Sequence, residues 1–191
     1  RRQRQMCIRD RHIYNLKSED LKELKSMNLL EELTLWDAKN INLNGLCQLT
    51  NIRMLDIVRS RKMVDIRGLC NSNRLEELTL SYCNNITDIS VLSHISGLKT
   101  LRLLNCKQLQ DLAQLVPNNT IEHINISSLK DLLFLEGMKQ LKSLCFDDVI
   151  NGDISPLLGF ALFRICKYGF KKEIFPYRKG SEPNTGKKPI E

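Results

Sequence analysis

Leucine and isoleucine recur along this chain in a fixed pattern, L-x-x-L-x-L. A small, cysteine or apolar residue follows three positions after each copy. Six copies are present, namely Leu30-Leu33-Leu35, Ile52-Leu55-Ile57, Leu75-Leu78-Leu80, Leu98-Leu101-Leu103, Ile121-Ile124-Ile126 and Leu141-Leu144-Phe146. Successive copies begin 22, 23, 23, 23 and 20 residues apart. A fixed spacing of this length is typical of a repeat protein in which each repeat forms one structural unit.

The two kinds of spacing within a repeat predict two kinds of local structure. Alternation at L-x-L places both apolar side chains on one face of a short strand. Further along the repeat, Ile86, Ile89, Leu92 and Ile95 recur at three-residue steps, which suits a helical or 3₁₀ turn. One such coil cannot bury its apolar side alone, so neighbouring coils must stack. The pattern therefore predicts an α/β solenoid with a short parallel β-sheet on the concave face and helical or 3₁₀ turns on the convex face.

The residue after the first apolar position of each copy alternates in charge. These residues are Glu31, Arg53, Glu76, Lys99, Glu122 and Lys142. In-register parallel strands lie about 4.8 Å apart, so stacking would place each of these charges between two opposite ones. The alternation is independent of the leucines and supports the same alignment of the coils.

The chain of 191 residues divides into three predicted parts. Residues 12–159 form the solenoid, with about six to seven repeats because Leu21, Leu24 and Leu30 look like the back half of an earlier one. Residues 160–191 are expected to form a C-terminal cap followed by a basic, disordered tail. Residues 1–11, RRQRQMCIRDR, resemble the translation of an adapter used in sequencing libraries, and we exclude them from fold reasoning. The alternative is a natural basic arm.

The net charge of +7 lies mostly at the two ends of the chain. Residues 1–11 carry five Arg and one Asp, and residues 160–191 carry eight Lys or Arg and three Glu. The repeats between them are slightly acidic, which argues against nucleic acid as a partner of the solenoid. The tail leaves contact with a membrane surface or nucleic acid open. No apolar run approaches the roughly 18 residues of a membrane span.

Two segments carry a family resemblance. LEELTLSYCNNITDISVLSHISGLKTL (75–101) and NGDISPL (151–157) resemble the leucine-rich repeats of the phosphatase-regulator and internalin-like class. With Cys83 and Cys106 at the turn, they are most similar to trypanosome-type, expression-site-associated leucine-rich repeat proteins. The resemblance implies a protein-binding role. The departures are Ala38, Ser60, Leu129 and Val149, where Cys or Asn is usual.

Turn cysteines also occur in the substrate receptors of ubiquitin ligases. The alternative function is therefore a substrate-recognition segment of such a ligase, whose RING or F-box part would lie outside this sequence.

The chain contains no C-x-x-C spacing, so we expect no metal. Scattered cysteines are interpreted as small buried residues, disulfides being the alternative. They favour a reducing, intracellular compartment, either cytoplasmic or nuclear.

Candidate catalytic groups are few. Among the histidines, only His123 falls on a strand position expected to face outward, and its inferred neighbours Thr100 and Ser143 belong to no nucleophile motif. No phosphate-binding glycine loop or H-E-x-x-H motif is present. We therefore predict a non-enzymatic protein that needs no cofactor and has no small-molecule substrate.

The outward positions of the strands are the better candidates. Trp, Tyr and Arg are typical anchors of protein interfaces, and they are present among these positions. The sequence predicts a monomeric scaffold that binds a protein partner across the concave sheet. The predicted contact residues are Glu32, Thr34, Trp36, Met54, Asp56, Val58, Glu77, Thr79, Tyr82, Arg102 and Leu104.

Overall fold

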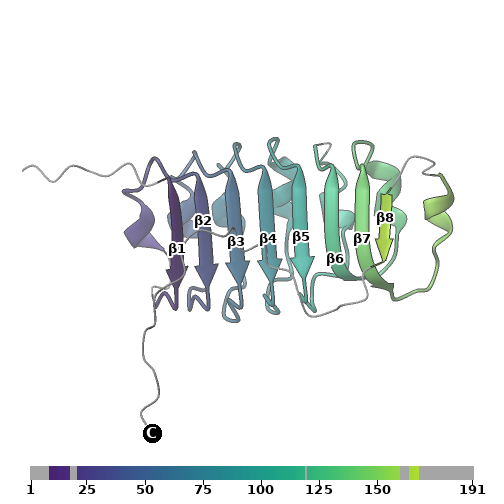
Figure 1. Ribbon diagram of the computed structural model, residues 1–191, viewed down its shortest axis with the longest axis horizontal. Coiled ribbons are helices and arrows are strands. Elements are labelled where there is room, and N and C mark those ends of the chain that lie inside the picture. Colours follow the sequence, from purple (N-terminus) through teal and green to yellow (C-terminus); the bar gives the residue numbers. More distant parts are fainter. Residues whose placement is uncertain (1–8, 18–20, 119, 160–163, 168–191) are drawn as a thin grey trace, which may run out of the picture.

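The computed structural model describes residues 9–17, 21–118, 120–159 and 164–167, and these form one row of stacked coils (Figure 1). Each coil contributes one strand to a parallel sheet in which the strand order is the chain order. The strands are β1 (Asp10–Tyr14), β2 (Glu32–Trp36), β3 (Met54–Val58), β4 (Glu77–Ser81), β5 (Thr100–Leu104), β6 (His123–Leu129), β7 (Ser143–Val149) and β8 (Arg164–Lys167).

A short 3₁₀ turn follows every strand from β1 to β7. The turns are η1 (Lys22–Leu24), η2 (Asn44–Leu46), η3 (Arg67–Leu69), η4 (Ser90–His94), η5 (Ala113–Leu115), η6 (Leu133–Gly137) and η7 (Ser155–Gly159). None of the helical elements in the described residues is an α-helix. The expectation of a parallel sheet opposed by short turns is confirmed.

The strands align in the register that the repeat predicts. Leu33, Leu55, Leu78 and Leu101 face one another on successive strands. These leucines and the second row, such as Leu35 and Ile57, are buried together with the apolar residues of the turns. The core is thus a continuous column of apolar side chains between the sheet and the 3₁₀ turns, because each coil covers the apolar side of the next.

The alternating charges also align as expected. The Arg53 guanidinium lies 3.1 Å from the Glu76 carboxylate, and Lys142 Nζ lies 2.8 Å from Glu122. The neighbouring Arg9 extends this ladder, with its guanidinium 3.6 Å from Glu31. Such exposed pairs add little stability but disfavour a shifted register.

The sheet extends beyond the strands of the six repeat copies, which are β2 to β7. One more strand is present at each end, β1 and β8. β1 begins at Asp10, so Asp10 and Arg11, expected outside the solenoid, pair with Glu32 and Leu33. Backbone hydrogen bonds need no particular side chain, which is how Arg11 occupies a leucine position of the register. At the other end, Arg164–Lys167 pairs with β7. The remainder of the predicted arm, cap and tail lies outside the described residues.

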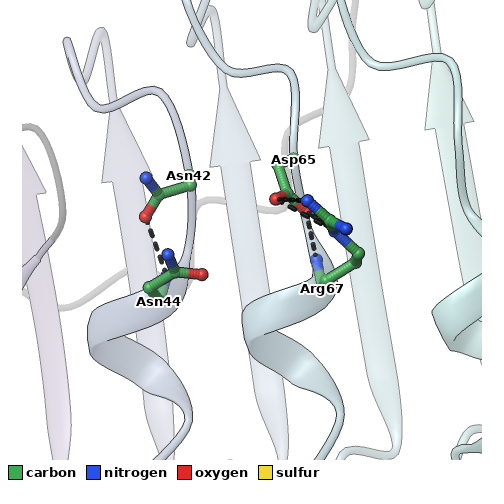
Figure 2. A network of polar contacts seen from close by, with 4 residues as sticks. All are labelled: Asn42, Asn44, Asp65 and Arg67. Atoms are coloured by element: carbon green, nitrogen blue, oxygen red, sulfur yellow. Dashed lines mark hydrogen bonds and ion pairs between the residues drawn. The ribbon is translucent and has the colours of Figure 1, made fainter.

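An aspartate or asparagine lies two residues before each of the turns η2 to η7, and its side chain caps the first N–H of the turn. Figure 2 shows two of these: Asn42 Oδ1 accepts from Asn44 N at 3.0 Å, and Asp65 Oδ1 accepts from Arg67 N at 2.8 Å. The same arrangement holds at Asp88, Asp111, Asp131 and Asp153. Hydrogen bonds from the Arg67 side chain lower the pKa of Asp65. The T-D-I-S segment forms one of these turns. The side chain of its aspartate satisfies a backbone N–H that would otherwise lack a partner.

The last full coils differ from the others at the edge where the strands end. Strands β2 to β5 have five residues, whereas β6 and β7 have seven. In β6 and β7 the buried Leu129 and Val149 belong to the strands, whereas Cys83 and Cys106 lie in turns beyond theirs. In both coils the strand continues through the position where the earlier coils have a left-handed residue. The spacing of 20 residues between β6 and β7 shortens the turn after β6, whereas after β7 a turn remains, in which Gly152 N donates to Val149 O at 3.0 Å.

Candidate protein-binding surface

The strand register divides the outward face of the sheet into three rows of side chains. The first row contains Glu32, Met54, Glu77 and Thr100, and the second contains Thr34, Asp56, Thr79 and Arg102. The third contains Trp36, Val58, Ser81 and Leu104. Ten of the eleven predicted contact residues therefore lie in one array, which we call the open face, and the eleventh, Tyr82, follows β4 directly.

Two of the predicted contact residues are covered. Val58 is only 2% exposed and Thr79 only 9% exposed. Val58 lies in register with the larger Trp36, and Thr79 hydrogen-bonds to Asp56. The expectation that both present surface to a partner is wrong for this arrangement of side chains. Their role is to pack and orient their neighbours.

A left-handed residue follows each of the first five strands. Asn15, Asp37, Arg59, Tyr82 and Asn105 have φ between 51° and 57°. Their N–H groups continue the sheet: Arg59 N donates to Ser81 O at 2.8 Å and Tyr82 N to Leu104 O at 2.9 Å. Asparagine and aspartate tolerate this conformation, whereas arginine and tyrosine adopt it rarely. The turn leaves Tyr82 44% exposed at the edge of the open face.

Aromatic and cationic side chains meet at this edge. The rings of Tyr14 and Trp36 have centroids 6.2 Å apart, and the Arg59 guanidinium lies over the Trp36 ring at 5.6 Å. Tyr14 is 68% exposed. The sequence prediction did not include Tyr14 or Arg59 among the contact residues. β1 lacks the paired leucines that mark a strand, and the stacking of Arg59 on a neighbouring coil depends on its left-handed backbone.

The centre of the open face is polar and carries charges of both signs. Arg102 Nη1 on β5 lies 3.0 Å from Glu77 Oε2 on the neighbouring strand β4. Burial raises the pKa of Asp56, and the hydrogen bond from Thr79 and the positive charge of Arg102 partly oppose this. A partner that covers this region must therefore supply polar groups that match both an acid and a base.

The one histidine expected on the open face does contact a serine. His123 Nδ1 and Ser143 Oγ are 2.7 Å apart, while His123 Nε2 is 3.9 Å from the Glu122 carboxylate. That second distance is too long for the hydrogen bond by which an acid orients a catalytic histidine. Glu122 instead pairs with Lys142. The contact belongs to the sheet surface and does not form a triad.

The turn cysteines are buried next to each other. Cys83 and Cys106 lie on adjacent coils as free thiols, and their hydrogen bond together with burial raises the pKa of Cys83. Such a thiol is unreactive and fills space. Within the part of the chain that the structure describes, no three His, Cys, Asp or Glu side chains gather as metal ligands would. None of its helical turns is long and apolar enough to cross a bilayer.

Comparison with known proteins identifies the fold. No family model and no curated protein sequence matches the chain. An internalin (inlF) from Listeria monocytogenes superposes with a TM-score of 0.68 at 24% identity, over 83% of this chain and 47% of that one. Internalin C2 from the same species gives 0.70 at 23% identity, over 83% and 70%.

A third similar structure is the leucine-rich repeat domain of the type III effector XCV3220 (XopL). It superposes with a TM-score of 0.59 at 14% identity, over 84% of this chain and 68% of that one. This chain spans about half the length of the inlF structure. At these identities the likeness concerns the fold, and with the repeat and the parallel sheet it shows that the chain is a leucine-rich repeat solenoid.

Proposed function

We propose that this solenoid is a non-enzymatic module that binds a protein partner across its open face. The single observation that carries the proposal is the cluster of the exposed Tyr14 and Arg59 around the half-buried Trp36, with the exposed Tyr82 at the next position along the edge. Tyrosine, tryptophan and arginine supply most of the binding energy in protein interfaces. An aromatic group already held by a cation loses little conformational freedom on binding.

The fold favours the same conclusion. A parallel sheet of stacked coils presents a rigid array of side chains at spacings of about 4.8 Å, and repeat proteins use such extended surfaces for recognition. The similarity to internalins and to an effector domain supports an interaction scaffold. The proposal also includes the more specific resemblance of residues 75–101 to trypanosome-type leucine-rich repeat proteins.

An affinity experiment tests the surface. The wild-type chain and the variant Trp36→Ala, Tyr82→Ala are used as baits in extracts of the source cells, with Val64→Ala, Leu133→Ala as a control. Val64 and Leu133 are 45% and 65% exposed and lie away from the sheet. The expected result is a loss of about tenfold or more in partner recovery for the first variant alone. Equal recovery with all three baits, each shown to be folded by its melting curve, would contradict the proposal.

The recognition segment of a ubiquitin ligase is the second candidate, favoured by the stacked Cys83 and Cys106. It would use the same surface and differs only in what the rest of the gene encodes. The upstream coding sequence tests it: a cysteine and histidine framework or an F-box helix pattern supports this function, and another domain contradicts it.

A further inference from the structure

The turns at the carboxyl ends of the first five strands form a second recognition element. We define the basic edge as residues 15–17, 37–39, 59–62, 82–85 and 105–107, the turns after β1 to β5, beside the arrowheads in Figure 1. We propose that the basic edge binds an acidic segment of the partner protein. This inference rests on the proposed function and adds the charge of the partner.

The basic edge carries six basic residues and one acidic residue. The basic residues are Lys17, Lys39, Arg59, Arg61, Lys62 and Lys107, all exposed, and the acid is Asp37. Among the described residues, no carboxylate forms an ion pair within 4.0 Å with any of these six. Arg53, Arg102 and Lys142, on the opposite edge and the open face, do have carboxylate partners. The basic edge is therefore a field of positive charge that no close ion pair within the described part of the chain neutralises.

The turns of the basic edge are held in place by one another. Lys39 N donates to Leu16 O at 2.8 Å, Asn85 Nδ2 donates to Arg61 O at 2.8 Å, and Lys107 N donates to Asn84 Oδ1 at 3.2 Å. These bonds join successive coils. The charges are consequently presented at fixed spacings, which lowers the entropic cost of binding a complementary segment.

The backbone of the basic edge is strained where its largest side chains project. Arg59 and Tyr82 have φ of 57° and 56°, a left-handed region that is unfavourable for residues with large side chains. Asn15, Asp37 and Asn105 occupy the equivalent positions at lower cost. Strain that persists in otherwise regular structure is commonly linked to function. Here it places one cation over Trp36 and one phenol at the rim of the open face.

The neighbouring charges favour an acidic protein over a nucleic acid. Glu32 and Glu77 lie at the far ends of β2 and β4 from the basic edge, and Asp56 lies midway along β3. A phosphate backbone that extended from the basic edge across the open face would be repelled by these carboxylates. One face of the Trp36 ring is covered by Arg59, which removes it as a platform for base stacking. A protein segment avoids both conflicts, because it can present carboxylates to the edge and neutral or basic groups to the open face.

Selection of short peptides tests the proposal without knowledge of the partner. The probe is a phage-displayed library of random linear peptides, selected on the full wild-type chain. Bound peptides are then measured on an edge variant, Arg61→Glu, Lys62→Glu, Lys107→Glu, which leaves the contact between Arg59 and Trp36 intact. The control variant, Lys25→Glu, Arg74→Glu, Lys139→Glu, makes the same change of net charge at exposed residues away from the basic edge. Single-stranded oligothymidylate and oligouridylate are measured in parallel.

The expected result is enrichment of Asp and Glu, with affinity about tenfold lower on the edge variant, nearly unchanged on the control, and reduced by salt. Equal weakening by both variants overturns the proposal, as does tighter binding of the oligonucleotides. Peptides without acidic enrichment that lose binding to the variant Trp36→Ala, Tyr82→Ala but bind the edge variant as tightly as the wild type overturn the charge recognition and leave the proposed function standing. Peptides that bind every variant alike, or a selection without binders, contradict both.

Discussion

The coils of β2 to β5 and those of β6 and β7 share one sheet and one core, but they end their strands differently. In the first group a left-handed residue follows five strand residues, and a turn projects beyond the sheet. In the second group the strand continues for two more residues, so that Leu129 and Val149 occupy the buried position within the strand itself. The core is preserved in both groups.

This difference shows which part of a coil can vary. The leucine positions and the capping aspartates are retained in the short coil of β6, since Ile124 and Asp131 occupy them. The residues that are missing come from the projecting turn, where the aromatic and basic side chains of the first group are found. The leucine positions and the capping residues of a coil therefore maintain its fold, whereas the projecting turn carries its recognition surface.

The largest change in the free energy of unfolding is expected where neighbouring coils contact each other. A Cβ at Gly68 would lie 2.1 Å from the Leu43 backbone oxygen, whereas a Cβ at Gly137 would meet the Val116 side chain at 2.3 Å. We expect Gly68→Ala to lower the free energy of unfolding by about 3 kcal/mol, because a backbone cannot move aside. Gly137→Ala should cost less, since Val116 can rotate. Urea unfolding measures both, and equal losses would show that the two coil contacts are equally adaptable.

A smaller effect of opposite sign is expected at the strand ends. Tyr82→Gly relieves a left-handed tyrosine and should raise the free energy of unfolding by about 0.5 kcal/mol, after the entropic cost of glycine. Ser128 pairs with Asp148 in regular strand geometry, so Ser128→Gly should lower it by about 0.5–1 kcal/mol. Thermal melts of both variants check the signs. A loss of stability in Tyr82→Gly would mean that its ring contributes more through packing than the turn costs.

The smallest effect depends on pH and compares two half-buried acids. Burial raises the pKa of Asp56 in β3 and of Asp147 in β7, but only Asp56 receives a hydrogen bond, from Thr79. A raised pKa means that the ionised carboxylate costs folded-state stability, fully so above the folded pKa and not at all below the unfolded value of about 3.9. Asp147→Asn and Asp56→Asn should therefore both raise the melting temperature at pH 7.

The control for this prediction is a melt at low pH. Both gains should vanish below pH of about 3.9, where the wild-type carboxyls are protonated in the folded and unfolded states alike. A gain that persists at low pH would show that packing, and not charge, distinguishes the asparagine variants.

The sequence was sufficient for the architecture because the determinants of the core are local and periodic. The L-x-L alternation, the three-residue steps and the alternating charges each depend on spacing alone, and all three agree with the register. The surface depends on contacts between coils. The burial of Val58 beside Trp36, the position of Arg59 and the strand at Asp10–Tyr14 follow from such contacts. The five left-handed positions after β1 to β5 hold four different residue types, so their alignment is visible only in the backbone.

The direction of the strands has a mechanical consequence. All eight lie across the long axis of the row of coils (Figure 1), so a force applied along that axis loads the hydrogen bonds of one strand pair at a time. Coils would then peel away singly from either end. Each release of 22 or 23 residues would lengthen the molecule by about 80 Å of extended chain, so the solenoid would yield in steps and would not break at once.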